Sequence, residues 1–286
     1  MATMERAASE LRGQIEARRR AGQTERAQVV GWQILLLVLI LGFWEWSTRV
    51  PWFVQHTIMD PFFVSRPSAI AQRIYEWTLG PKRGLLWPHL ASTLWATFLG
   101  LIVGVATGFA VGLALSQNRL LARVLNPYVI GLNSVPRIAL VPLITMLFGL
   151  GVGSMVVTAW FMVFFLIFFN TFKGGRSIER ELVDFCRTLG GSPRQITRTV
   201  RVPNALAWAF TALPNAVSFA LIGVVISEFV GSTTGMGYLM ITSLATLNST
   251  DMFSSVVVLS AVGVILVTLI RRVEHRLLRW APEFRS

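Results

Sequence analysis

Long apolar runs recur along the chain and are separated by short polar segments. Six of them are long enough to form helices that cross a bilayer, which requires about 20 mostly apolar residues. These runs lie at 31–50, 89–115, 124–148, 152–172, 205–230 and 253–272. The pattern predicts an all-α integral membrane protein with six transmembrane helices.

The order of apolar and polar segments also predicts how the chain is divided. We expect a polar N-terminal arm, a first span with an outer loop, a core of five spans and a tail, at 1–30, 31–88, 89–280 and 281–286. In the outer loop, Ile70, Ile74 and Trp77 recur at helical spacing. This spacing predicts a short amphipathic helix that either packs against the spans or lies on the outer membrane surface.

One ridge of the second span consists of small residues at intervals of four: Ala96, Gly100, Gly104, Gly108, Gly112 and Ser116. In lipid, where van der Waals packing replaces the hydrophobic drive, small residues at this spacing allow another helix backbone to approach closely. We therefore predict that this span packs tightly against a second helix along the ridge.

Composition supports a membrane protein and excludes other classes. Of the 286 residues, 53% are hydrophobic and 14% are charged, whereas soluble domains carry about 25% charged residues. The net charge of +12 does not indicate nucleic acid binding, because the basic residues flank the apolar runs. Cys186 is the only cysteine, so the chain offers neither an internal disulfide nor a cysteine zinc site.

The distribution of basic residues predicts the orientation of the chain. Lys and Arg are concentrated in the N-terminal arm and at 119–123, 173–201 and 271–285, whereas the loops at 149–151 and 231–252 contain none. Positive residues favour the cytoplasmic side of a membrane. We therefore expect the N and C termini, and the polar loop at 177–203, to be cytoplasmic.

The first half of this 177–203 segment has the pattern of a capped amphipathic helix. Ser177 is placed to cap its N-terminus, and apolar residues recur at spacings of three and four: Ile178, Leu182, Phe185 and Leu189. Gly190 and Gly191 are expected to end it, because glycine adopts a left-handed conformation without strain.

The second half of the segment predicts another helix immediately after the glycines. Ser192, Pro193 and Gln195 have the spacing of a capping box with proline at the first helical position. Pro203 is expected to stop this helix. Two capped helices could dock a partner protein or lie against anionic lipid headgroups, and the physical argument leaves both possibilities open.

The segment resembles a known signature through the spacing Asp184-x5-Gly190-x9-Val200-x-Val202-Pro203. It is similar to the EAA signature of the membrane-spanning permease subunits of ATP-binding-cassette (ABC) importers. The region from 89 to 280 resembles the nitrate/taurine-type branch of those permeases. The resemblance implies a type I ABC importer permease of MetI-like architecture in the bacterial cytoplasmic (inner) membrane.

The resemblance also implies partners and functional residues. The expected partners are a second copy of this chain, two ATP-binding ATPase subunits on the cytoplasmic side, an extracytoplasmic solute-binding protein and membrane lipid, but no nucleic acid. The implied ATPase-coupling residues are Asp184, Phe185, Cys186, Arg187, Gly190, Gly191, Ser192, Pro193, Val200 and Pro203. Phe185 and Cys186 replace the two alanines of the signature, whereas Asp184 keeps the negative charge of its glutamate.

No pattern in the sequence indicates catalysis by this chain. Lys82 and Lys173 are the only lysines, and neither lies in a phosphate-binding loop motif. We expect no cofactor and no metal on this chain, with ATP and Mg²⁺ used by the partner subunit. The predicted function is the permease subunit of an ATP-driven, binding-protein-dependent importer. The alternatives are an ion-gradient-driven secondary carrier or channel, and a membrane-embedded enzyme.

Ionisable and polar residues inside the spans are candidates for the transport path, because burying such groups in a membrane is costly. The candidates are Asn133, Pro136, Arg137, Asn215, Ser218 and Glu228. Pro136 and Pro142 loosen the helix around Arg137, which either lines the path or is structural. For Glu228 we favour a structural or outer-gate role. A buried arginine favours a small anionic solute, in the nitrate, sulfonate, taurine, aromatic-acid or pyrimidine-precursor class that the resemblance implies.

Overall fold

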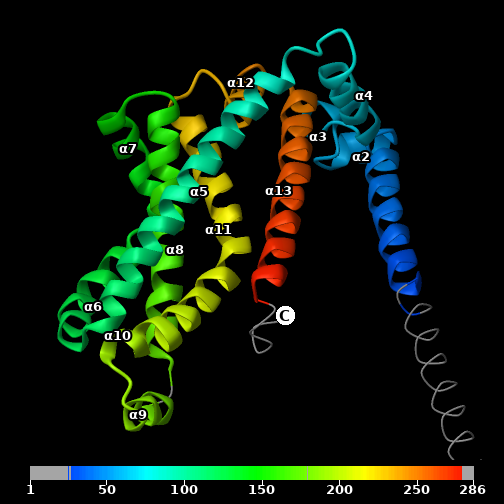
Figure 1. Cartoon of the computed structure of the whole chain (residues 1–286). Coiled ribbons are helices and arrows are strands. Elements are labelled where there is room, and N and C mark those ends of the chain that lie inside the picture. The colour runs from blue at the N-terminus through cyan, green and yellow to red at the C-terminus, as the bar shows by residue number, and fades with distance from the viewer. Residues whose placement is uncertain (1–24, 26, 179, 279–286) are drawn as a thin grey trace, which may run out of the picture. The chain divides into compact units, whose positions relative to one another are not determined.

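The computed structural model describes residues 25, 27–178 and 180–278, without the side chains of Arg119, Leu121, Asn126, Asn133 and Arg180. Every regular element in these ranges is helical (Figure 1). The predicted tail at 281–286 and most of the predicted arm at 1–30 lie outside the described residues.

The described residues form two compact units, one ending at Ile70 and the other beginning at Ala71. The first unit contains an apolar helix, Ala27–Ser47, followed by α2 (Pro51–His56), α3 (Pro61–Val64) and the start of α4 (Pro67–Thr78). Glu45, in the last turn of the apolar helix, forms an ion pair with Arg49 at 2.6 Å. It also accepts hydrogen bonds from the backbone N–H and the hydroxyl of Ser68, at 3.0 and 2.9 Å.

The second unit contains the rest of α4 and all later helices. In chain order these are α5 (Leu86–Gln117), α6 (Arg119–Ser134), η1 (Arg137–Leu140), α7 (Val141–Phe148), α8 (Val152–Arg176), α9 (Arg180–Thr188), α10 (Pro193–Ile196), η2 (Thr197–Arg201), α11 (Val202–Gly231), α12 (Met236–Ala245) and α13 (Ser249–Leu277). In the described ranges, five helices are long and apolar enough to cross a membrane, and a bent pair makes a sixth if it forms one span. This agrees with the six predicted spans.

The bent pair replaces the continuous third span that the sequence predicted at 124–148. Its two parts, Ala122–Leu132 and Arg137–Phe148, meet at an angle of 80°. Pro136 adopts an extended conformation between them, with φ −61° and ψ 101°. Because proline lacks an N–H and its ring clashes with the preceding turn, the helix ends before it and restarts in a new direction.

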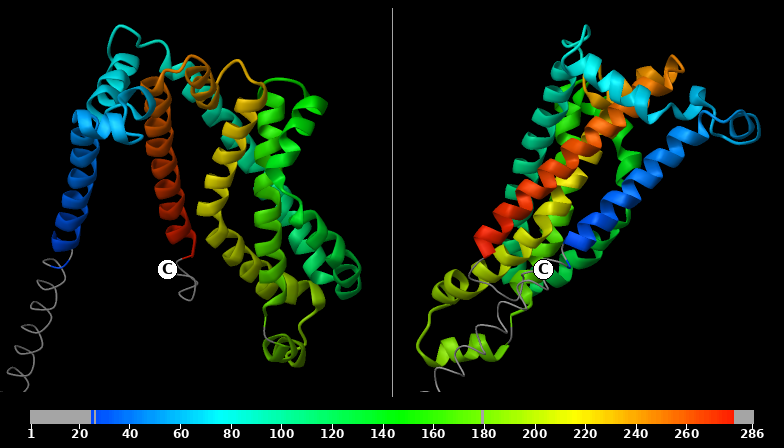
Figure 2. Two further views of the ribbon diagram at one scale, coloured as in Figure 1. Left: turned by 180° about the vertical axis from the view of Figure 1, so that it is seen from behind. Right: turned by 90° about the vertical axis from the view of Figure 1, so that its right-hand side faces the viewer.

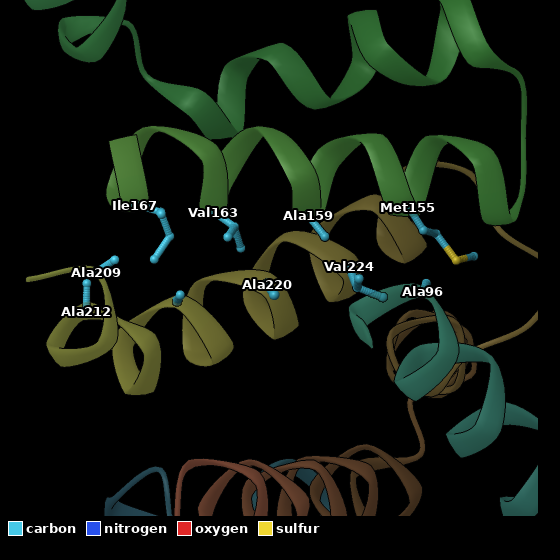
Figure 3. Packing of buried hydrophobic residues seen from close by; sticks show 10 residues of the cluster. Ala96, Met155, Ala159, Val163, Ile167, Ala209, Ala212, Ala220 and Val224 are labelled. Atoms are coloured by element: carbon cyan, nitrogen blue, oxygen red, sulfur yellow. The ribbon is translucent and has the colours of Figure 1, made fainter. Parts of the chain in front are cut away.

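The core of the second unit is formed by α8, which packs between α5 and α11 (Figures 1 and 2). Figure 3 shows one face of α8 against an alanine-rich face of α11, with a contribution from α5: Met155, Ala159, Val163, Ile167, Ala209, Ala212, Ala220, Val224 and Ala96. Such small side chains allow the helix backbones to lie close together.

The small-residue ridge of α5 lies against α8 at the edge of this same face, beside Ala159, Val163 and Ile167. All six residues of the ridge are buried. A Cβ added at Gly104 would lie 2.7 Å from the side chain of Val163, and one at Gly112 would lie 2.8 Å from the carbonyl oxygen of Phe168. Neither distance leaves space for a larger side chain, so α5 and α8 approach as closely as glycine permits.

The predicted amphipathic helix is confirmed as α4, and its apolar side is packed. Within the second unit, Trp77 is 1% exposed and contacts Leu86 of α5 together with Met236 and Leu239 of α12. The guanidinium of Arg73 forms an ion pair with Asp251 of α13 at 3.0 Å. This part of α4 therefore packs against the spans, which was one of the two predicted alternatives.

Candidate functional site

The helix α9 presents its apolar stripe to the exterior of the chain. Leu182, Phe185 and Leu189 are 46, 61 and 73% exposed, respectively. On the other side of α9, Asp184 and Arg187 form an ion pair at 3.0 Å, with about two thirds of each side chain exposed. An exposed pair of this kind contributes at most about 1 kcal/mol, so both charges can exchange partners at little cost.

Ser177 does not cap α9, contrary to the prediction. Because α8 extends to Arg176, Ser177 becomes its C-cap and donates its backbone N–H to the carbonyl of Lys173 at 2.8 Å. The side chain of Asn204, in the first turn of α11, donates to the carbonyl of Gly174 at 2.7 Å and to the hydroxyl of Ser177 at 3.0 Å. Asn204 therefore joins the two ends of the 177–203 segment, a role that the sequence analysis missed.

The predicted glycine corner and capping box are both present. Gly190 has φ +81°, and its N–H donates to the carbonyl of Arg187 at 2.9 Å, while Gly191 donates to Cys186 at 3.0 Å. This pair of hydrogen bonds is the Schellman arrangement. Immediately afterwards, the hydroxyl of Ser192 accepts from the N–H of Gln195, and the side chain of Gln195 accepts from the N–H of Ser192. The connection is therefore closely fixed on both sides.

Pro203 does not stop the second helix, which also differs from the prediction. The chain continues through α10, the π-helical turn η2 and α11 as one helical run, Pro193–Gly231. In η2 the N–H of Val202 donates to the carbonyl of Thr197, five residues earlier. A widened turn moves the preceding carbonyls away from the proline ring, which would clash with them in an α-helix. The predicted fifth span at 205–230 is therefore part of a longer helix.

A basic cavity lies beside α9, at the ends of α5 and α8. It has a volume of about 420 Å³, and its charged lining residues are Arg123, Arg176, Arg187, Arg201 and Asp184. Of the other predicted coupling residues, Cys186 and Val200 are half-buried and Pro193 is exposed. Asp184 and Arg187 of the predicted set line this cavity, whereas Phe185 is exposed on the other side of α9 and Val200 lies in η2.

The predicted path residues are distributed over α6, η1 and α11. Arg137 is half-buried in η1, directly after Pro136, with its guanidinium 5.4 Å from the ring centre of Phe165 on α8. On α11, Asn215 is exposed, and Ser218 lines a shallow cavity between α11 and α13. The side chain of Asn133 lies outside the described part of the structure.

Glu228 lies in a separate buried cluster that joins α11 to α5 and α12. Its side chain is 1% exposed, and its carboxylate accepts hydrogen bonds from the hydroxyl of Thr93 and the N–H of Gly237, each at 2.7 Å. The sequence analysis identified Glu228 but not Thr93. A single threonine inside an apolar span does not indicate which residue it will bind, because the pairing with Glu228 depends on tertiary structure.

These features define a class of protein. A helical membrane chain with a close-packed core, a broken span beside an arginine and a capped, exposed helix between spans has the architecture of a transporter permease subunit. The chain belongs to the family of binding-protein-dependent transport system inner membrane components, which residues 85–279 match.

Individual proteins agree with this assignment. The chain is 28% identical over 246 residues to the formylaminopyrimidine transport permease protein ThiX of Halalkalibacterium halodurans, covering 86% of this chain and 94% of that protein. It is 25% identical over 252 residues to the taurine transport system permease protein TauC of Escherichia coli, and the match covers 87% of this chain and 88% of that protein. An inward-facing structure of the MetNI methionine ABC transporter shares the fold, with a TM-score of 0.59, 24% identity, and coverage of 72% of this chain and 99% of that one.

The predicted recognition, fold class and transport role are thereby confirmed. The chain is a multi-pass inner-membrane permease subunit of an ABC importer, of the nitrate/taurine/sulfonate branch, and it is a transport subunit rather than an enzyme. Membership of this family implies an ATPase and a solute-binding protein as partners.

Proposed function

We propose that two copies of this chain form the translocation pathway and that each copy docks one ATPase subunit through the 177–203 segment. In this arrangement both termini and the segment are cytoplasmic. The ATPase subunits bind ATP and Mg²⁺, and an extracytoplasmic binding protein delivers a small anionic solute.

The observation that carries the docking proposal is the exposed apolar stripe of α9. In the described part of the chain, Leu182, Phe185 and Leu189 remain 46, 61 and 73% exposed. Burying a side chain the size of leucine or phenylalanine stabilises a contact by about 1.5–3 kcal/mol. Three of them, with an exchangeable ion pair beside them, suit an apolar groove on a partner protein better than the aqueous side of a membrane.

The connection from α9 to the long helical run, and the contact of that run with α8, support the use of α9 as a coupling element. The capping box and the Schellman turn fix α9 to the start of the long helical run, and Asn204 fixes that run to the end of α8. A displacement of α9 is therefore passed to two membrane helices rather than absorbed in a loose loop.

Arg137 supports an anionic solute. Its guanidinium is half-buried beside the break in the third span and packs on an aromatic ring, and guanidinium groups bind carboxylates and sulfonate-like anions through several donors. Among the relatives, the names of TauC and SsuC refer to taurine and aliphatic sulfonates, which carry an anionic sulfonate, whereas the name of ThiX refers to a formylaminopyrimidine, which is not an anion. We assign the solute of this importer to the small sulfonates and related anions.

An exposed apolar tip supports pairing with a second copy. Met146, Leu147 and Leu150, on α7 and the following turn, are 84, 69 and 77% exposed. They lie at the far end of α7, the helix that follows η1, and a second copy covering this tip would bury them with Arg137 on the same broken span.

The docking proposal is tested by Phe185→Ser in the chain co-expressed with its ATPase. Loss of the buried ring should weaken association by about one to two orders of magnitude, as follows from about 1.5–3 kcal/mol. The measurement is the amount of ATPase that co-purifies in a salt and dilution series. The matched control is Phe63→Ser, because Phe63 on α3 is equally exposed, at 65% against 61%.

Equal ATPase recovery from both variants would contradict the proposed docking surface. Uptake by proteoliposomes that contain this chain alone, without ATP, would contradict the proposed energy source.

A further inference from the structure

The N-terminus of α12 is capped by side chains from two other helices. Its N-cap residue is Gly235, which has no side chain to accept a hydrogen bond. Instead, three consecutive backbone N–H groups donate outward: Gly235 to Nδ1 of His89 at 3.0 Å, Met236 to the hydroxyl of Thr93 at 2.8 Å, and Gly237 to the carboxylate of Glu228 at 2.7 Å. Two of these acceptors belong to α5 and one to α11.

Glu228 and Thr93 bind each other as well as α12. The hydroxyl of Thr93 donates to one carboxylate oxygen of Glu228 at 2.7 Å, while Gly237 donates to the other oxygen. These short hydrogen bonds to both oxygens offset the cost of burying the polar carboxyl group. The positive end of the α12 dipole also faces the carboxylate. We call His89, Thr93, Glu228 and residues 235–237 the Glu228 cluster.

The glycines of the cluster fit closely around the carboxylate. Gly235 has φ +117°, and any Cβ at that position would overlap the carboxylate of Glu228. A Cβ at Gly237 would lie 2.7 Å from the carbonyl oxygen of Val225 and 2.9 Å from the carboxylate. The sequence Gly-Met-Gly at 235–237 therefore allows α12 to begin in direct contact with Glu228.

Glu228 and the 177–203 segment lie toward opposite ends of the same helical run. The run extends over Pro193–Gly231, and α9 and α12 lie at opposite ends of the second unit (Figures 1 and 2). Glu228 is 35 residues beyond Pro193, about 50 Å along the helix at 1.5 Å per residue. Hydrogen bonds at its far end connect the run to α12.

We propose that Glu228 is a positioning residue that makes α12 move together with α11, so that a movement begun at the 177–203 segment repositions α12 at the opposite end of the protein. The inference rests on the proposed docking of the ATPase to that segment. Thr93 holds the carboxylate toward α12, and the stacking of His89 on Tyr238 at 5.8 Å keeps the start of α5 beside the same helix.

The test uses the assembled importer, with its ATPase and binding protein, in proteoliposomes. Glu228→Gln keeps the shape of the side chain but replaces one carboxyl oxygen by an amide NH₂ group, which donates and cannot accept. Thr93→Val removes only the hydroxyl, and Thr93→Ser restores it. The matched control is Glu274→Gln, because Glu274 is a buried carboxylate on α13 outside the Glu228 cluster.

The decisive readout is the number of solute molecules imported per ATP hydrolysed. Glu228→Gln and Thr93→Val are expected to lower this ratio about tenfold, the effect of losing one buried hydrogen bond, while ATP hydrolysis continues. Thr93→Ser and Glu274→Gln should keep the wild-type ratio.

A second readout measures α12 directly. Spin labels are attached to unnatural amino acids that replace Val230 of α11 and Leu244 of α12, both exposed, so that Cys186 stays unchanged. The distribution of distances between the two labels should stay narrow with and without ATP when Glu228 is present. It should broaden in Glu228→Gln.

Reduced yield or thermal stability of the variants, with an unchanged import ratio and a narrow distance, would overturn the proposal and leave Glu228 as a helix cap only. If Glu228→Gln does not fold, the Thr93→Val and Thr93→Ser pair decides the question by the same two readouts. Failure of the docking proposal would be seen differently: the amount of ATPase that co-purifies would not change in Phe185→Ser, and this result does not depend on the Glu228 cluster.

Discussion

The contact between α5 and α8 can be tested with a single methyl group at Gly108. A Cβ there would lie 2.8 Å from the carbonyl oxygen of Phe164, 3.2 Å from the Cβ of Ile167 and 3.2 Å from the backbone nitrogen of Phe168. Two of these atoms belong to the backbone of α8 and cannot rotate away. Carbon and carbonyl oxygen normally approach to about 3.3 Å, so Gly108→Ala would force the helices apart by about 0.5 Å.

The expected cost follows from two opposing effects. Overpacking a close contact costs about 1–3 kcal/mol, whereas replacing glycine by alanine inside a helix gains about 1 kcal/mol of helix propensity. Gly131→Ala is the matched control, because Gly131 lies inside α6 with no atom within 4 Å of an added Cβ. The difference between the two variants isolates the overpacking cost of about 1–3 kcal/mol.

The measurement is the fraction of purified importer that remains monodisperse on size exclusion after heating, under identical heating times because unfolding is irreversible. We compare the temperature at which half of the importer is no longer monodisperse. At about 2–4 °C per kcal/mol, this temperature should be about 2–12 °C lower for Gly108→Ala than for Gly131→Ala. Midpoints within 1 °C of each other would refute the close approach of α5 and α8 along the ridge.

Two further predictions concern the path and the 177–203 segment. Arg137→Ala should lower uptake while leaving the ATPase bound, as measured by uptake and co-purification on the same preparation, and unchanged uptake would make Arg137 structural only. Ser192→Ala removes a capping-box acceptor worth about 1 kcal/mol, so amide exchange at Gln195 should accelerate about fivefold. Ser134→Ala, whose hydroxyl only contacts its own helix, should leave that exchange rate unchanged.

Features encoded in neighbouring residues could be predicted from the sequence. The length of the apolar runs gave the spans, and the spacing of Ser192 and Gln195 gave the capping box, because both depend on residues within a few turns. The small residues of α5 likewise indicated a helix contact. They did not identify α8 as the partner, and the alanine face of α11 that packs on α8 was not noticed.

Features that depend on competition between elements could not be predicted. Ser177 suits the start of α9, but the longer α8 takes it as a C-cap. Pro203 is a good helix terminator in isolation, yet a widened turn keeps the helix continuous into the membrane. The partners of Glu228 lie 135 residues before it and 9 after it in the chain, and no local pattern specifies such a pairing.

The widened turn η2 keeps the long helix continuous through Pro203 without changing the direction in which α9 leaves it. A turn with hydrogen bonds between residues five apart holds one residue more than an α-helical turn. Deleting a single residue between Thr197 and Arg201 would leave an α-helical turn, and the apolar stripe of α9 would stay at nearly the same azimuth. The ring of Pro203 would then clash with a carbonyl of the preceding turn, so one inserted residue makes the proline compatible with an unbroken bilayer crossing.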